Sequence, residues 1–281
     1  MVAIDREELL GIAHAERQRL GRMIQFAEPD SWEQPSADPG WWNRDVMAHL
    51  MAGDTAAAQL MAREPAEELE EYRAQLGDEP FSVDGWNAWT VNRRSALETR
   101  TILDTWGAAA ESFLVYAGKL DDDDWRNARF PWIAGDIAAR YLVQSRVIEW
   151  FLHGEDMRAT NGVGSGWQIG WQHWPVYLTI DLAVRMLPWA LGQAGHDLSG
   201  QSVQIDVEGA GEGSWHQALG IGEVPDPERK PVATIVGRAP QFALVTGKRL
   251  DPDEVLASGS VVLGGDADTA DLIIRTIRAY P

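Results

Sequence analysis

The pattern of apolar and polar residues changes once along the chain and divides the sequence into two parts. In about the first 160 residues, apolar positions recur at intervals of three and four, as on one face of an α-helix. This spacing predicts helices over residues 5–26, 43–62, 84–120 and 137–159, with Asn43 as the N-cap of the second helix. We expect these four helices to form a four-helix bundle within residues 1–162.

The segments between the predicted helices have the composition of loops. Residues 28–40 contain three prolines, and the acidic residues 64–80 are consistent with a short helix or an ordered loop. Residues 121–124 are all aspartate and are predicted to form a solvated turn. The glycine-rich segment NGVGSGWQIG, residues 161–170, is predicted to be a linker between two domains.

Shorter elements are predicted beyond this linker. A helix is expected over residues 172–191, and strand-like runs follow at 202–207, 214–219 and 233–236. Helices are then expected over residues 240–248 and 267–279. Strands followed by helices indicate a small α+β domain over residues 171–281, so the predicted fold class is α plus α+β.

The composition narrows the possible functions. A net charge of −19 repels phosphate backbones and anionic lipid headgroups, which argues against nucleic acids and membrane surfaces as partners. The chain has no cysteine, which excludes disulfides, thiolate ligands and a cysteine nucleophile. The first residues are charged and have no signal-peptide core, and no apolar run is long enough to span a bilayer. We therefore expect a cytoplasmic protein.

Glu149 and His153 are four residues apart in the predicted helix over residues 137–159. On a helix this spacing places the two side chains on one face, with their Cβ atoms about 5–6 Å apart, within reach of a single metal ion. The same spacing also arises in exposed pairs and around hydrogen-bonded core histidines. The pair alone is therefore compatible with either interpretation.

His49 lies on the apolar side of the predicted helix over residues 43–62, where a lone histidine is usually a satisfied core residue. If this helix faces the helix over residues 137–159, however, His49 meets Glu149 and His153. Two neutral imidazoles and one carboxylate are a common three-ligand set for a catalytic divalent ion.

Two segments resemble the signatures of a known family. WWNRDVMAHL, residues 41–50, fits W-x-x-R-D-V-x-x-H-L, and EWFLHGED, residues 149–156, fits E-x-x-x-H-G-x-D, both from the mycothiol-dependent maleylpyruvate isomerase family of DinB-like bundles. In that family the histidine of the first motif and the glutamate and histidine of the second hold the metal. The resemblance assigns a divalent metal ion to His49, Glu149 and His153. Zinc is the first choice, and iron, manganese and nickel also suit two histidines and one carboxylate.

The resemblance extends more loosely to the second domain, which in the family is similar to sterol carrier proteins. A segment that begins at Gly237 and continues through FALVTGKR, residues 242–249, is similar to a strand-to-helix segment of that domain. In the family an arginine of this domain reaches the active site. Arg238 is the first candidate for this catalytic role and Arg249 the second, and a surface or domain-interface role is the alternative for both.

Five further residues near the motifs are candidates for the site. Asp45 and Asp156 could accept the second N–H of His49 and His153 and so orient each imidazole. For Asp45 the alternative is a favourable position near a helix N-terminus, and for Asp156 it is a solvated helix end. Three tryptophans are candidate lining residues of a substrate pocket, although most tryptophans serve packing: Trp41, Trp42 and Trp150.

The resemblance implies a reaction between two small molecules. The metal would leave positions open for a thiol, which the family supplies as mycothiol, and the thiolate would attack an electrophilic substrate. The product is either a thioether or an isomer, so the enzyme is expected to be a metal-dependent thiol S-transferase or thiol-dependent isomerase. A thiol-independent DinB-like metalloenzyme that uses metal-bound water or Lewis-acid catalysis is the alternative, and a non-catalytic carrier is a third.

Overall fold

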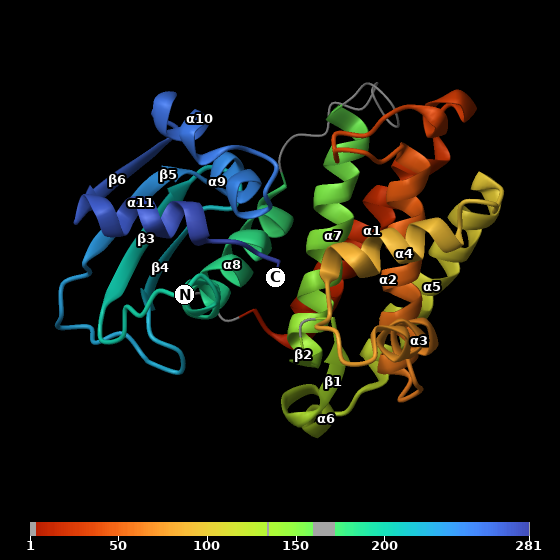
Figure 1. Ribbon diagram of the computed structural model, residues 1–281, viewed down its shortest axis with the longest axis horizontal. Coiled ribbons are helices and arrows are strands. Elements are labelled where there is room, and N and C mark those ends of the chain that lie inside the picture. The colour runs from red at the N-terminus through yellow and green to blue at the C-terminus, as the bar shows by residue number, and fades with distance from the viewer. Residues whose placement is uncertain (1–3, 134, 160–171, 281) are drawn as a thin grey trace. The chain divides into compact units, whose positions relative to one another are not determined.

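The computed structural model describes residues 4–133, 135–159 and 172–280 (Figure 1). These residues belong to two compact units, one within residues 4–168 and the other within residues 169–281. The predicted linker, residues 161–170, lies outside the described residues.

The first unit is built around four long helices, α1 (Arg6–Gln25), α2 (Asn43–Met61), α5 (Thr99–Lys119) and α7 (Ala139–Ala159). Helix α2 packs against α5 and α7, and α1 packs against α7 and α5, which gives the predicted bundle. The apolar positions that predicted these helices form its core, with fully buried side chains from all four: Leu20, Met47, Phe113 and Val147.

The helix predicted over residues 84–120 is two helices, α4 (Val83–Arg93) and α5. Arg94 follows α4 as its C-cap, and its buried guanidinium donates to the Thr90 carbonyl and to Glu68 of α3 (Glu67–Leu76). These contacts hold a turn between the two helices. Because Glu68 is 26 residues from Arg94, the local apolar spacing gave no sign of the break.

The connections contain more regular structure than expected. Residues 64–80 contain helix α3, which agrees with the short helix considered for this segment. The 3₁₀ helix η1 (Pro29–Glu33) lies in the predicted loop at 28–40. The aspartate run begins helix α6 (Asp122–Asn127), because the side chain of Asp121 accepts the Asp124 N–H and caps it. The run is exposed to solvent over residues 121–123, as predicted, but the turn predicted there is wrong.

A short antiparallel hairpin before α7 was not predicted. It consists of β1 (Arg129–Trp132) and β2 (Gly135–Ala138), and it delays the start of α7 to Ala139. Phe130 and Trp132 of this hairpin are buried. Four-residue strands are too short to give a clear alternation of apolar and polar residues, which explains the omission.

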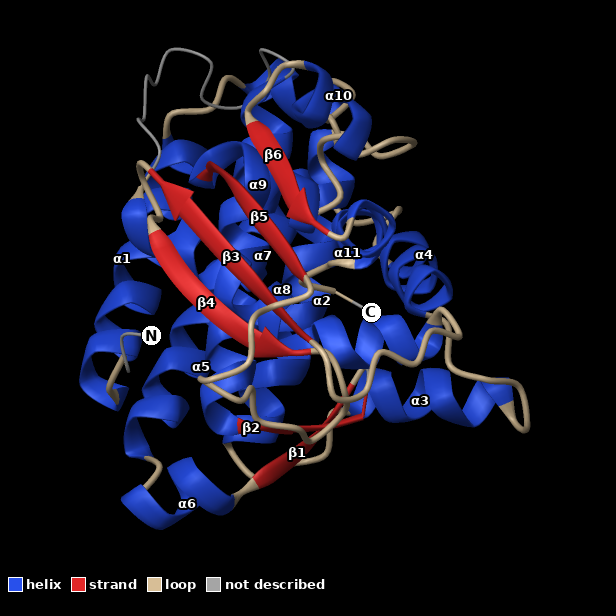
Figure 2. Ribbon diagram, turned by 90° about the vertical axis from the view of Figure 1, so that its left-hand side faces the viewer, coloured by secondary structure: helices blue, strands red, loops and turns tan. Residues whose placement is uncertain are grey.

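The second unit is a four-stranded sheet packed against helices (Figure 2). The strand order is β4 (Gly213–Ala218), β3 (Ser202–Glu208), β5 (Ala233–Arg238) and β6 (Val261–Gly265), with only β3 and β5 parallel. Helices α8 (His173–Gln193), α9 (Ala239–Thr246) and α11 (Ala267–Thr276) pack against it. Strand β6 and the short helix α10 (Pro252–Ala257) were not predicted.

The structure confirms the predicted fold class, a mainly helical unit followed by a small unit with a sheet. Within the described ranges, each helix is too short or too polar to cross a membrane.

The N-terminus of α2 differs from the prediction by one residue. Trp42 occupies the cap position, and Asn43 is the first residue of the helix, with its buried amide donating to the Ser31 carbonyl. Asp45 Oδ2 accepts the backbone N–H of Trp42 at 3.0 Å. This contact satisfies a backbone group at the helix start and places a negative charge in the first turn, and both effects stabilise the helix.

We predict that Asp45→Ala lowers the free energy of unfolding by about 1 kcal/mol, since a helix-capping acceptor is lost. Asp45→Asn should retain most of this stability, because its amide oxygen can still accept the Trp42 N–H. Urea denaturation of the three proteins checks this. An Asp45→Ala protein as stable as the wild type would contradict a capping role.

Candidate metal centre

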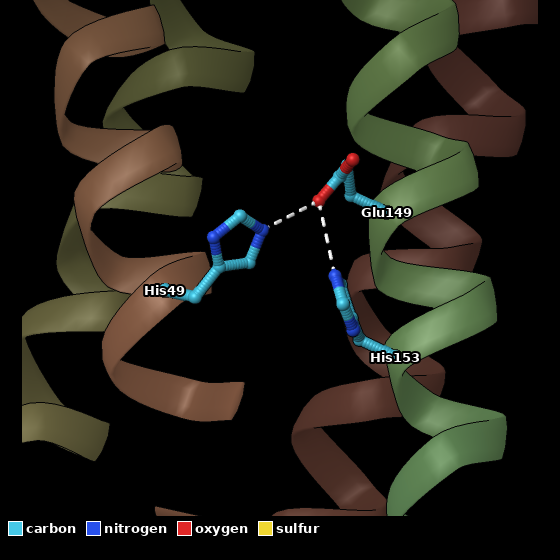
Figure 3. Close-up of side chains that lie close together, drawn as sticks. All are labelled: His49, Glu149 and His153. Atoms are coloured by element: carbon cyan, nitrogen blue, oxygen red, sulfur yellow. Dashed lines mark hydrogen bonds and ion pairs between the residues drawn. The ribbon is translucent and has the colours of Figure 1, made fainter. Parts of the chain in front are cut away.

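His49, Glu149 and His153 meet between α2 and α7 (Figure 3). Glu149 and His153 lie one turn apart on α7, as their spacing predicted, and His49 reaches them from α2. Glu149 Oε2 is 2.9 Å from His49 Nε2 and 3.3 Å from His153 Nε2. The three side chains are only 7–13% exposed. His49 was expected to join the pair only if its helix faced the helix with Glu149 and His153. Helices α2 and α7 do pack against each other.

The three residues fit a divalent metal ion. One ligand atom from each lies within 4.8 Å of the other two. Ligand atoms of a tetrahedral ion with bonds of about 2.0–2.2 Å are about 3.4 Å apart, so the short separations within the triad are close to those needed. In addition, the buried Nδ1 of His49 has no hydrogen-bond partner among the described residues, so hydrogen bonding does not fully satisfy this imidazole.

The protonation states of the metal-free protein also suit a cation. Burial lowers the pKa of His49, and the nearby Glu149 carboxylate opposes this effect without cancelling it. Burial raises the pKa of Glu149, but hydrogen bonds from His153 and His49 outweigh it and hold this pKa well below its usual value. At neutral pH the site therefore contains a neutral His49 imidazole and an ionised Glu149, the forms that bind metal.

Asp156 lies on the opposite side of the His153 ring from Glu149. Its Oδ2 is 3.0 Å from His153 Nδ1, and the carboxylate is almost fully buried. This is the contact expected of a residue that accepts the second N–H of the imidazole and directs Nε2 toward the ligand position. Asp38, which the sequence analysis did not single out, lies 4.0 Å from the same nitrogen.

The loop before α2 brings Trp41 to the candidate site. The loop is joined to α7 by a hydrogen bond from Ala37 N–H to the Asp156 carbonyl. The Trp41 ring centroid is 5.2 Å from that of His49 and 6.4 Å from that of His153. Trp42 is 47% exposed at the start of α2. Of the predicted pocket tryptophans, Trp41 is thus the one in ring contact with the histidines.

Trp150 has a different environment from the one expected. It has no exposed surface, its indole Nε1 donates to Asp54 at 2.7 Å, and its ring meets Phe113 edge to face. A side chain without exposed surface cannot line an open cleft, so the structure replaces the predicted pocket role of Trp150 with a packing role.

Asp45 does not form the contact expected with His49. Its carboxylate caps α2 through the Trp42 N–H, and His49 Nδ1 lacks a partner within the described part of the chain. The alternative considered for Asp45, a favourable position at the helix start, matches its observed contact.

Arg238 and Arg249 both belong to the second unit. Arg238 ends β5 and caps α9, and its exposed guanidinium pairs with Glu208 at 3.2 Å. Arg249 Nη1 donates to the Gly247 carbonyl at 2.7 Å, and the side chain lines a hollow of about 630 Å³ with Lys248 and residues of α8 and α11. A catalytic role for either arginine remains a prediction.

Asp54 and Arg146 belong to no motif that marked them in the sequence. They form a buried ion pair between α2 and α7, with Arg146 Nε 2.6 Å from Asp54 Oδ1. Arg146 precedes Glu149 by three residues and Asp54 follows His49 by five, so a charged pair close to the ligands in sequence was the available signal.

The fold and the site together define a class: a helical bundle whose α2 and α7 bring two histidines and a glutamate to one point. The model of the mycothiol maleylpyruvate isomerase N-terminal domain matches residues 13–158, a range that includes all three side chains. The chain belongs to this family.

Two solved structures are similar to nearly the whole chain. They are crystal structures of the mycothiol-dependent maleylpyruvate isomerase, with a TM-score of 0.61, and of a histidine-to-alanine mutant of it, with 0.60. In both comparisons 94% of this chain and 96% of the other are covered at 15% sequence identity. At this identity the likeness establishes the fold. A comparison with curated proteins gives no match.

We predict that the metal-free protein loses stability as the pH falls from 7.5 to 5.5, and that His49→Gln reduces this loss. The folded protein resists protonation of His49, whereas the unfolded chain binds that proton near the ordinary pKa of about 6.5. Folding therefore becomes less favourable below about pH 6.5. Urea denaturation in EDTA at both pH values measures the effect.

Glu149 does not contribute to this pH window. Its folded pKa is lowered, so the stability it provides is present above the usual glutamate value near 4.3 and is lost only at lower pH. An equal loss in the wild type and in His49→Gln would contradict a lowered pKa at His49.

Proposed function

We propose that this chain is a divalent-metal-dependent enzyme that activates a small-molecule thiol, with mycothiol as the first choice, for attack on an electrophilic substrate. The reaction class is a thiol-dependent isomerisation or a thiol S-transfer. Membership of the mycothiol maleylpyruvate isomerase family supports the thiol and the isomerase assignment. Zinc is the metal we expect first, because two imidazoles and one carboxylate are a common zinc ligand set.

The observation that carries the proposal is the convergence of His49, Glu149 and His153 on one point between α2 and α7. Three protein ligands leave at least one coordination position for another molecule, which distinguishes catalytic sites from structural four-ligand sites. A divalent ion there would lower the pKa of a thiol that reaches it and so supply a nucleophile at neutral pH.

The protein's own residues would prepare this site. Asp156 holds the His153 ring through Nδ1 and leaves Nε2 directed at the site, and the Glu149 carboxylate supplies negative charge. Trp41 covers the histidines from the loop before α2. The absence of cysteine from the chain agrees with a thiol that comes from outside.

Substrate binding in the proposal involves the second unit. Arg238, or Arg249 as the second choice, would bind a substrate carboxylate, since a guanidinium pairs with carboxylates through two parallel hydrogen bonds. Arg238→Ala should then raise KM for a carboxylate substrate and leave metal content unchanged, and if it does not, Arg249→Ala should.

We predict that the purified protein binds about one divalent ion and converts maleylpyruvate, or consumes thiol with another electrophile, only when mycothiol is present. Treatment with EDTA should abolish turnover and added Zn²⁺ should restore it. Elemental analysis, product identification and a thiol assay separate the two reaction classes, because an isomerase regenerates the thiol and a transferase consumes it.

Glu149→Gln should weaken binding of the ion by more than about 100-fold. This loss of affinity is larger than the loss expected for a residue outside the ligand set. Glu111→Gln, the same substitution in an exposed ion pair with Arg17, is the control and should bind metal like the wild type. Metal-dependent turnover without thiol would instead establish the thiol-independent alternative. A wild-type protein that retains no metal would contradict the proposal as a whole.

A further inference from the structure

A buried carboxylate, Asp54, joins three helices of the bundle next to the candidate metal ligands. It has no exposed surface and accepts hydrogen bonds from Arg146 Nε at 2.6 Å and Trp150 Nε1 at 2.7 Å, both on α7, and from Trp106 Nε1 on α5 at 2.8 Å. Three donors on one carboxylate satisfy its charge without water. We call Asp54 and these three donors the Asp54 cluster.

The Asp54 cluster lies one layer from the ligands. On α7, Arg146 precedes Glu149 by three residues and His153 by seven, so all three side chains lie along one stripe of the helix. On α2, Gly53 follows His49 by one turn. The interface thus has one layer where His49 meets Glu149 and a next layer where Gly53 and Asp54 meet Arg146.

Gly53 allows the Arg146 guanidinium to lie against α2. A Cβ atom at Gly53 would be 3.1 Å from both Nη1 and Nη2 of Arg146, tighter than an ordinary contact. On another side the guanidinium faces the Trp132 ring, whose centroid is 5.9 Å from Cζ. Arg146 is 3% exposed, so little space is left for the guanidinium to shift.

Stability alone is a weak reason for burying these charges. A buried ion pair replaced by well-packed apolar side chains is often as stable or more stable, because desolvation offsets the attraction of the charges. What a directional pair does provide is register, since Nε of Arg146 and Oδ1 of Asp54 meet at only one sliding position of α7 along α2. That same sliding position brings His49 to Glu149 and His153.

We propose that Asp54 and Arg146 are positioning residues for the metal ligands: by fixing the register of α2 against α7, they set the distance from His49 to the Glu149–His153 pair. The inference rests on the proposed metal site and deepens it, because it assigns an effect on metal affinity to two residues outside the proposed ligand set.

The first test compares Asp54→Asn with Asp181→Asn. Asp181 of α8 is a buried carboxylate in the second unit that also accepts from an indole and a guanidinium, those of Trp215 and Arg185. The side-chain amide of asparagine cannot accept from all the donors that the carboxylate serves, so both variants should lose stability. Only Asp54→Asn should raise the apparent Kd for Zn²⁺, measured by chelator competition, by about 10–100-fold.

The visible spectrum of the Co²⁺-substituted protein supplies a second readout. Its d–d bands depend on the arrangement of the ligands, so Asp54→Asn should shift them and Asp181→Asn should not. The positioning role would be overturned if Asp54→Asn lost stability but kept its Kd within twofold of the wild type and its spectrum unchanged. The proposed metal function would not be affected by that result. A wild-type protein that binds no metal would overturn both.

A second pair of variants covers the case in which Asp54→Asn fails to fold. Gly53→Ala adds a Cβ against the Arg146 guanidinium, whereas Gly107→Ala adds one on α5 with no atom within 4 Å. Alanine favours a helix over glycine by about 1 kcal/mol, so Gly107→Ala should raise the melting temperature and leave the Kd unchanged. Gly53→Ala should raise the Kd at least threefold, and equal Kd values in these two variants would contradict the inference.

Discussion

The packing of α2 against α7 is the constraint on which the candidate site depends, and it is governed by charges buried in that interface. Asp54, Arg146 and Glu149 all carry ionisable groups there, with little or no access to water. Each must find an oppositely charged or hydrogen-bonding partner in the protein, because an unpaired buried charge is costly. Only a narrow range of helix registers provides those partners at once, so the same requirement that stabilises the interface also sets the geometry of the histidines.

The sequence predicted the bundle because each long helix carries its own apolar spacing, and it predicted Glu149 and His153 because they share one helix. To place His49 beside them, it was necessary to know that two helices face each other. The family motifs implied this, and the packing of α2 on α7 supports it. Two features that depend on distant contacts and belong to no motif were not predicted. The turn after α4 is held by Arg94 and Glu68, and the β1–β2 hairpin by burial of two aromatic rings.

Among the residues around the ligands, those in contact within one helix could also be predicted, and those in contact between helices could not. Asp156 is three residues from His153, so the contact between them could be predicted within one helix. Asp54 and Arg146 are 92 residues apart, and neither belongs to a local pattern of its own. Trp150 was misplaced for a related reason: its position beside Glu149 in sequence suggested the site, but neighbouring residues on a helix point in directions about 100° apart. Its indole donates to Asp54 and has no exposed surface.

The second unit contains a cluster around Asp181 that resembles the Asp54 cluster but has no candidate metal ligands beside it in the part of the chain that the structure describes. Asp181 accepts from Trp215 and Arg185 much as Asp54 accepts from Trp150 and Arg146, yet no group of metal-ligating side chains adjoins Asp181 among the described residues. A buried aspartate that accepts from an indole and a guanidinium is therefore first of all a packing device, found in the described residues at Asp54 and at Asp181. In the bundle the device also bridges the two helices that carry the ligands, one helical turn from them, whereas Arg185 and Asp181 share a single helix and fix no register. The difference between the two clusters lies in the elements they connect, and that difference is the reason to assign the Asp54 cluster a role in metal binding.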